Sequence, residues 1–188
     1  MRGVAISYPT FYSWYQAIIT ETSGSVTALG SRLIPRKNFE TDEKISQFTD
    51  TLLKVQGQNK EIPILGHLVA GGAVSHSKEE TSVLPAWRDA LWHIVVSNGW
   101  SDNSTIAEQH EIARNITRTT KFLRDITPGS GSYLNEADVN EPEWQQSFFG
   151  NNYPRLKVIK MKYDPSGLFM CRKCVGSEEW SEDLNCRV

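Results

Sequence analysis

Carboxylate, amide and phenol side chains gather in the short segment Tyr133-Leu-Asn-Glu-Ala-Asp138. It follows Gly129-Ser-Gly-Ser132, whose small residues predict a flexible hinge. Two interpretations fit these residue types. The segment is a polar turn, or it is a strand end that presents an acid or base to a substrate. On the residues alone, a solvent-exposed turn carboxylate is the favoured interpretation of Glu136.

Three cysteines, Cys171, Cys174 and Cys186, lie near the C-terminal end of the sequence. The first two have Cys-x-x-Cys spacing, but a zinc site needs about four ligands and no histidine lies close by in the sequence. The odd number of cysteines does not suggest a disulfide framework. We therefore expect unpaired cysteines with neither a metal nor a redox role.

Two other groups of titratable residues have a simple structural interpretation. His93 lies among apolar neighbours, where a histidine is more often a satisfied structural residue than a ligand. Lys157, Lys160 and Lys162 form a small basic patch, which we interpret as the solvated face of a helix rather than an anion site. The sequence thus predicts no metal site.

Composition excludes several classes of function. The chain has 188 residues, 39% of them hydrophobic, with a net charge of -2. This charge argues against nucleic acid as a partner, and no apolar run approaches the roughly 20 residues that span a bilayer. We expect a single globular domain without a signal peptide, which leaves localisation open. The sequons at Asn103 and Asn115 matter only if the chain is secreted.

Apolar spacing predicts the elements that position these side chains. Short strands are expected at residues 26–29 and 31–34, and further strands at 62–69 and 84–100. Helices are expected at 42–55, 104–126 and 141–149, and a last one that begins after Gly150 and ends at Tyr163. The order lacks regular βαβ alternation. It predicts an α+β fold, an antiparallel sheet with helices packed on one face and short C-terminal helices.

Several motifs in the C-terminal half resemble the berberine bridge enzyme family of flavin-linked oxidases. Family members carry Tyr-x-Asn-Tyr-Arg-Asp, then Phe-Gly-x-Asn-Phe/Tyr-x-Arg-Leu, then Val/Ile-Lys-x-Lys-x-Asp-Pro and an aromatic residue. In this chain the matching segments are Tyr133–Asp138, Phe149–Leu156, Ile159–Pro165 and Phe169. Pro85–Arg88 with Trp100 is similar to an earlier family stretch, and Ser31–Pro35 resembles the fungal branch.

The resemblance implies that residues 1–188 form one substrate-type domain, with 131–176 as its berberine-like segment. In the family the FAD-binding domain is separate and N-terminal, and we expect it to be absent from this sequence. The chain would then be a fragment, or one half of an enzyme whose FAD domain is a separate chain. Such an enzyme would oxidise a small alcohol, sugar or secondary metabolite with oxygen as acceptor. The alternative is a stand-alone metabolite-binding, isomerase or cyclase domain without redox chemistry.

The resemblance also implies roles for individual residues. Glu136 occupies the position of the family's catalytic tyrosine base, and a glutamate can act as a base there if burial raises its pKa. Tyr133, Asn135 and Asn152 match positions on the cofactor side. Asp138 is expected to pin the loop, and Arg155 to pin the following helix.

Overall fold

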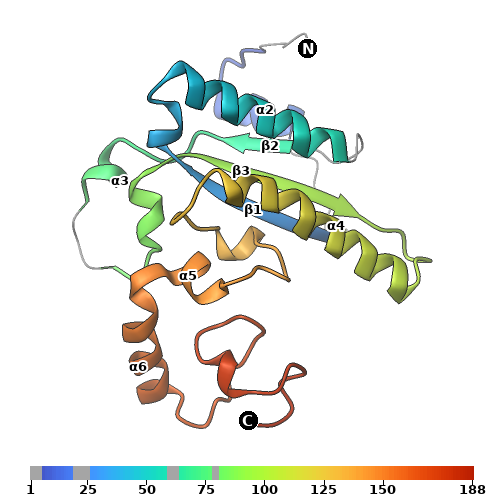
Figure 1. The fold of residues 1–188 in the computed structure, drawn as a ribbon, viewed down its shortest axis with the longest axis vertical. Coiled ribbons are helices and arrows are strands. Elements are labelled where there is room, and N and C mark those ends of the chain that lie inside the picture. The colour runs from blue at the N-terminus through green and yellow to red at the C-terminus, as the bar shows by residue number, and fades with distance from the viewer. Residues whose placement is uncertain (1–5, 19–25, 59–63, 78–80) are drawn as a thin grey trace.

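The central element is a three-stranded antiparallel sheet (Figure 1). The computed structural model describes residues 6–18, 26–58, 64–77 and 81–188. Strand β3 (Ala90–Gly99) lies between β1 (Thr27–Pro35) and β2 (Ile64–His67). The α+β class and the antiparallel pairing predicted from the sequence are confirmed.

Strand boundaries differ from the predictions in three places. β1 is one strand where two were expected, because Gly30 stays paired with Val96. The strand expected from residue 84 starts at Ala90, because Pro85–Arg88 forms a 3-10 turn. The strand expected at residues 62–69 ends at His67 as β2, two residues earlier than predicted. Residues 62 and 63 of that prediction lie outside the described residues.

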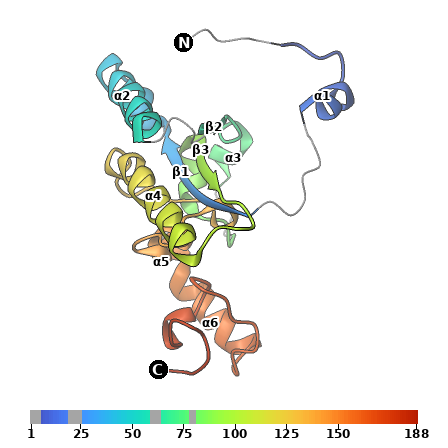
Figure 2. The same cartoon turned by 90° about the vertical axis from the view of Figure 1, so that its right-hand side faces the viewer.

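Two long helices, α2 (Asp42–Gln58) and α4 (Ile106–Asp125), cover one face of the sheet (Figure 2). Both confirm predicted helices. The shorter helices are α1 (Phe11–Ile18), α3 (Ala73–His76), α5 (Trp144–Phe149) and α6 (Tyr153–Tyr163). No helix is predicted at α1 or α3, and α5 begins three residues later than expected because Glu143 has a positive φ of 46°. Within the described residues, no helix is both long and apolar enough to cross a membrane.

Helix α4 starts at a capping box, in which Thr105 and Glu108 satisfy each other's backbone N–H groups. Its apolar stripe buries Ile116 and Leu123 completely, and each such side chain stabilises the fold by roughly 1.5–3 kcal/mol. The core between the helices and the sheet contains Ala28, Ile34, Phe48, Val55, Ile94, Val96, Ile116 and Leu123.

The opposite face of the sheet carries His67, His93 and Leu33. His93 is the cross-strand partner of both other residues, and partners on antiparallel strands point to the same face. Leu33 is buried in a second cluster with Leu84 and Ala90. This face is therefore partly apolar and carries two imidazoles side by side.

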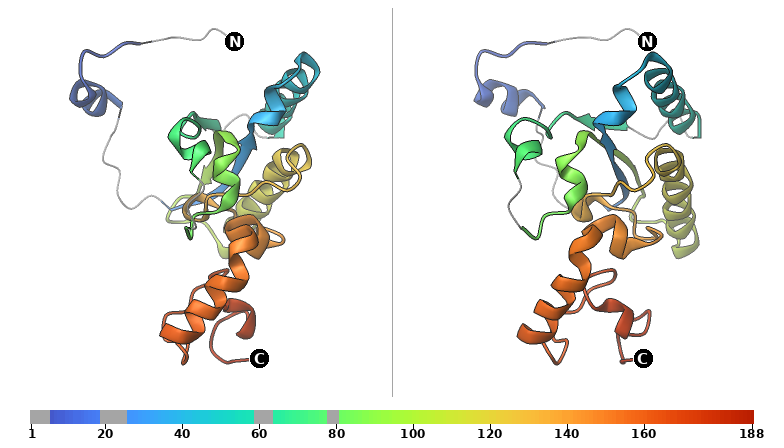
Figure 3. Two further views of the ribbon diagram at one scale, coloured as in Figure 1. Left: turned by 90° about the vertical axis from the view of Figure 1, so that its left-hand side faces the viewer. Right: turned by 60° about the vertical axis from the view of Figure 1, so that its left-hand side comes forward.

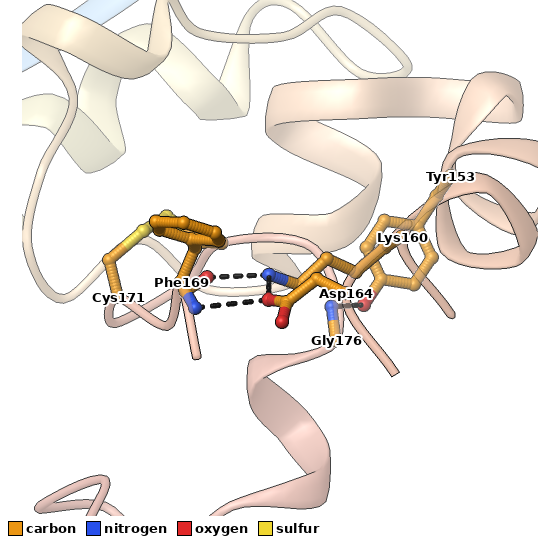
Figure 4. The surroundings of a disulfide bond; sticks show 7 residues. Tyr153, Lys160, Asp164, Phe169, Cys171 and Gly176 are labelled. Atoms are coloured by element: carbon orange, nitrogen blue, oxygen red, sulfur yellow. Dashed lines mark hydrogen bonds and ion pairs between the residues drawn. A yellow bond between two sulfur atoms is a disulfide. The ribbon is translucent and has the colours of Figure 1, made fainter. Parts of the chain in front are cut away.

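The C-terminal segment lies beside α6, away from the sheet (Figure 3). Cys171 and Cys174 form a disulfide there (Figure 4), so the prediction that they are unpaired is wrong. Their spacing permits it, because a turn with a backbone hydrogen bond from Cys174 N to Cys171 O brings the two Cα atoms to 5.3 Å. Cys186 is a free, exposed cysteine.

Two of the three lysines on α6 are paired rather than simply solvated, contrary to the sequence prediction. Lys157 Nζ lies 2.7 Å from carboxylate oxygens of both Glu178 and Glu179. Lys160 forms an ion pair with Asp164 and donates to the carbonyl of Phe169 (Figure 4). These contacts tie the C-terminal segment to the helix.

Gly30 allows α4 to lie directly against β1, and its substitution tests that contact. A Cβ there would lie 2.3 Å from Thr120 Oγ1 and 2.8 Å from Ile116 Cγ2. Gly30→Ala should lower the free energy of unfolding by about 1–3 kcal/mol in denaturant titrations. Gly57→Ala is the control, because no described atom lies within 4 Å of its Cβ position; it should stabilise helix α2 by about 0.4–1 kcal/mol. Equal effects of the two substitutions would contradict the close approach.

Asp164 closes the end of α6, and its titration reports on this closure. The Lys160 ammonium foremost, then the amides of Phe169 and Leu168, lower the pKa of Asp164 to about 2. Because its pKa is lowered, the ionised Asp164 contributes to the stability of the fold at pH values above the ordinary pKa of 3.8. This contribution is lost as the pH falls through about 2.

NMR titration of the Asp164 carboxyl should therefore give a value near 2 in the wild type and one closer to 3.8 in Lys160→Met. Asp183 is the control, because Ser181 and Asn185 lower its pKa instead. An unchanged Asp164 titration in Lys160→Met would show that the lysine is not the cause.

Candidate functional site

Glu136 lies over the face of the sheet that α2 and α4 leave uncovered. It ends a 3-10 turn, Leu134–Glu136, and its side chain is 35% exposed. Oε2 lies 3.6 Å from Nδ1 of His93 and has no hydrogen-bond partner among the described residues. Glu136 is therefore not the fully exposed turn carboxylate that the residue types alone favour.

His93 is buried with 3% of its surface exposed, as the sequence predicts, but its hydrogen bonding is not satisfied. Nε2 has no partner within the described part of the chain. Burial foremost, with the neighbouring His67, lowers the pKa of His93 to about 4. The imidazole is thus neutral near pH 7, and its contact with Glu136 is not an ion pair.

Aromatic rings surround His93. The ring centroids of Trp87, Tyr133 and His67 lie 5.5, 5.7 and 5.7 Å from the His93 ring. Tyr133 also contacts Trp87 edge to face at 5.9 Å, and its hydroxyl accepts a hydrogen bond of 2.6 Å from Asn135 Nδ2. Three of the four predicted site residues, Tyr133, Asn135 and Glu136, therefore lie together.

Asn152 contacts a different segment. Its Nδ2 donates to the carbonyls of Thr81 and Val83 at 3.2 and 2.9 Å. These bonds hold the chain ahead of the Pro85–Arg88 turn, and the same residues line a groove with Arg88 and Arg155. The described contacts do not join Asn152 to Glu136, and its cofactor role stays a prediction.

The stretch Gly129–Ser132 is a fixed connection, so its prediction as a flexible hinge is wrong. The hydroxyls of Ser130 and Ser132 donate to the carbonyls of Leu33 and Ser31, both at 2.7 Å. Gly131 O also accepts the N–H of Leu33 at 2.9 Å. Small side chains are required for this packing, because a Cβ on Gly131 would lie 2.5 Å from the carbonyl oxygen of Ser147.

A buried carboxylate, Glu141, holds the other end of the segment that carries Glu136. Its Oε2 accepts from Arg124 Nη1 at 3.0 Å, and its Oε1 accepts from Ser147 Oγ at 2.8 Å and lies 3.8 Å from Arg32 Nη1. Lys173 Nζ reaches the backbone carbonyl of Glu141 at 2.6 Å. One residue thus connects β1, α4, α5 and the C-terminal segment.

Arg32 is itself buried, and burial lowers its pKa to about 10. Its Nε and Nη2 donate to the hydroxyl and carbonyl of Thr127 at 2.9 and 2.8 Å. The guanidinium is therefore charged at pH 7 and depends on Glu141 for a counter-charge.

Asp138 has the structural role that the sequence predicts. It is 2% exposed and accepts from the backbone N–H of Asn140 at 2.8 Å and from the Thr117 hydroxyl at 3.1 Å. Burial raises the pKa of its carboxyl, which these bonds and the nearby Arg124 oppose. Asp138 therefore pins the loop to α4.

Sequence reasoning missed His67, Arg32 and Glu141 as residues of the site and its support. A signal existed for the histidines alone, since two strands each carrying a histidine can align them across the sheet once the register is known. The Arg32–Glu141 pair is separated by more than a hundred residues in the sequence, and only the tertiary fold brings the two side chains together.

Removing the Glu141 charge tests this support. Glu141→Gln leaves the buried Arg32 without its counter-charge and leaves Arg124 with only Asp138, at 3.9 Å, so the free energy of unfolding should fall by about 3–5 kcal/mol in denaturant titrations. Glu143→Gln is the control, because Glu143 is exposed and should have no measurable effect. Equal free energies of unfolding for the two variants would show that the charge of Glu141 does not stabilise the fold.

Residues 132–176 match the protein family described as "Berberine and berberine like". The chain is 42% identical over 187 residues to an uncharacterized FAD-linked oxidoreductase of Arthroderma benhamiae, covering 98% of this chain and 32% of that protein. It is 31% identical to FAD-linked oxidoreductase OXR2 of Pyricularia oryzae, covering 92% and 30%. The chain spans about a third of the length of these relatives.

The crystal structure of the VAO-type flavoprotein MtVAO713 from Myceliophthora thermophila superposes with a TM-score of 0.83 at 28% identity. That match covers 96% of this chain and 33% of the flavoprotein. The family match covers residues 132–176, whereas the sequence relatives and the fold match almost the whole chain. The chain therefore belongs to the berberine bridge enzyme-like FAD-linked oxidoreductases and matches their C-terminal part.

Proposed function

We propose that this chain is the substrate half of an FAD-linked oxidoreductase that oxidises a small alcohol, sugar or secondary metabolite with oxygen as acceptor. Glu136 would be the catalytic base. The observation that carries the proposal is the carboxylate of Glu136, which lies 3.6 Å from a neutral imidazole with an oxygen that no described group satisfies. Buried polar atoms without a partner indicate a position that a ligand completes.

The residues on this face fit a flavin ring and a substrate. Nε2 of His93 and Oε2 of Glu136 are polar atoms that await a partner, and aromatic rings wall the site. Tyr133 and Asn135 would contact the ring system of the cofactor. Asn152, whose Nδ2 is held by two carbonyls, would reach it through its side-chain oxygen.

Exposed apolar side chains flank the same face. Leu65, on β2 two residues before His67, is 54% exposed, and Leu68 and Val69 beyond it are 61% and 63% exposed. Leu134, beside Glu136, is 39% exposed. Contiguous exposed apolar side chains are typical of a surface that another part of a protein covers. We infer that the flavin-carrying half covers this surface and excludes water from Glu136.

In the proposed reaction Glu136 takes the proton of a substrate hydroxyl at Oε2. The neutral His93 beside it can accept a hydrogen bond from the same substrate, because an uncharged imidazole has one acceptor nitrogen. Trp87 and Tyr133, which contact each other edge to face, would form an aromatic wall that orients the substrate. When bound, FAD would accept the hydride from the substrate carbon and later pass the electrons to oxygen.

Glu136→Gln tests the base. In an active assembly of this chain with a flavin-carrying half, turnover measured as hydrogen peroxide formation should fall about 10²–10⁴-fold, because the amide cannot accept the proton. Flavin content should stay unchanged. Glu143→Gln, an exposed glutamate nearby in the sequence, should keep full turnover. Full activity of Glu136→Gln would remove Glu136 as the base.

Visible absorption separates this proposal from a stand-alone domain without redox chemistry. The purified chain is incubated with FAD alone or with a flavin-carrying half, and free cofactor is removed. Flavin bands that co-purify with this chain from either mixture support the proposal. A chain that stays colourless with FAD alone and forms no complex with the flavin-carrying half would favour the stand-alone domain.

A further inference from the structure

A cluster of metal-ligating side chains lies at the face of the sheet opposite α2 and α4. His67, His93 and Glu136 each offer one ligand atom, and these three atoms all lie within 4.8 Å of one another. The two histidines come from paired positions on β2 and β3, and the glutamate comes from the turn above them. We propose that these three residues form a binding site for one divalent transition-metal ion, with Zn²⁺ as the ion that the donor set favours.

The spacing of the donors suits a single ion. Zinc binds imidazole nitrogen and carboxylate oxygen at about 2.0–2.2 Å, so two ligands at a tetrahedral angle lie roughly 3.3 Å apart. Glu136 Oε2 and His93 Nδ1 are 3.6 Å apart, which needs only a small side-chain adjustment. His67 and His93 are cross-strand partners with ring centroids 5.7 Å apart, so their register already brings the imidazoles together.

A second observation also indicates a missing ligand. Oε2 of Glu136 and Nε2 of His93 are both buried without a hydrogen-bond partner in the described part of the chain. Burial of unsatisfied polar atoms costs free energy, and a metal ion would use the carboxylate directly. The other imidazole nitrogen of His93 could then donate to a water molecule or a substrate oxygen.

The types of ligand atom indicate which class of metal ion the site would bind. Two imidazoles and one carboxylate suit zinc and its neighbours in the transition series, whereas calcium and magnesium prefer oxygen ligands. Three protein ligands leave one position of a tetrahedral zinc ion open to water or to a substrate oxygen. The site would therefore take small oxygen-containing ligands through the metal.

This inference does not depend on the proposed oxidoreductase. A metal-bound carboxylate is not available as a base, so zinc should inhibit any reaction in which Glu136 takes a proton. Because zinc binding can be measured without flavin or substrate, either proposal can fail while the other stands.

Calorimetric titration of the 188-residue chain with ZnCl₂ tests the site. All variants carry Cys186→Ser and are kept without reductant, so that neither the free thiol nor Cys171 and Cys174 compete for zinc. The background chain should bind one Zn²⁺. His67→Ala and Glu136→Gln should each weaken binding more than about 100-fold, beyond the 10–100-fold loss typical of supporting residues.

The other two histidines of the chain provide matched controls. His76 and His110 are exposed and lie outside the cluster, so His76→Ala and His110→Ala should bind zinc as the background does. Thermal unfolding of each variant verifies that it is folded. If His67→Ala fails to fold, Glu136→Gln alone tests the site. This variant should fold, because the Glu136 side chain is partly exposed and glutamine has the same shape as glutamate.

Failure of the background chain to bind zinc would overturn the inference. Retained binding in either His67→Ala or Glu136→Gln would do the same, because the site requires both ligands. Loss of binding in the two controls would point to zinc held elsewhere and would also overturn it.

Discussion

The pairing of Glu141 with two arginines is the interaction on which the functional face depends. The carboxylate is 1% exposed, and Arg32 on β1 and Arg124 on α4 are both largely buried beside it. A buried charge that loses its partner is strongly unfavourable, so the elements carrying these three residues must stay together. The segment between Ser130 and Glu141 is thereby held at both ends, at one by β1 and at the other by this pair. Glu136 lies in the middle of that segment.

Burial gives the side chains of this face their chemical character. His93 sits between aromatic rings and a second imidazole, which keeps it neutral near pH 7. Glu136 beside it retains one oxygen without a described partner. A neutral imidazole and an unsatisfied carboxylate can share a proton, a hydroxyl group or a metal ion. Glu136 is thus both the proposed base and a proposed metal ligand, and it cannot serve in both roles at the same time.

Nearly the whole chain matches about a third of the length of each of these relatives. The exposed apolar side chains on its surface agree with a place in a larger assembly. One face of the sheet packs against α2 and α4 in an ordinary core. On the other face Leu65 is more than half exposed, and so are Leu68 and Val69 just beyond the end of β2. An apolar rim around unsatisfied polar atoms is the surface expected where a cofactor-bearing part would lie.

The sequence by itself determined the class of fold, the two long helices and the family. Apolar spacing acts locally, so the ends of α2 and α4 could be predicted to within three residues. The family motifs likewise brought Tyr133, Asn135 and Glu136 to one segment. Only the tertiary structure decided that His67 and His93 meet Glu136, that Cys171 pairs with Cys174, and that Glu141 is buried between Arg32 and Arg124. Strand register and long-range charge pairing depend on contacts between residues far apart in the sequence, which no local pattern encodes.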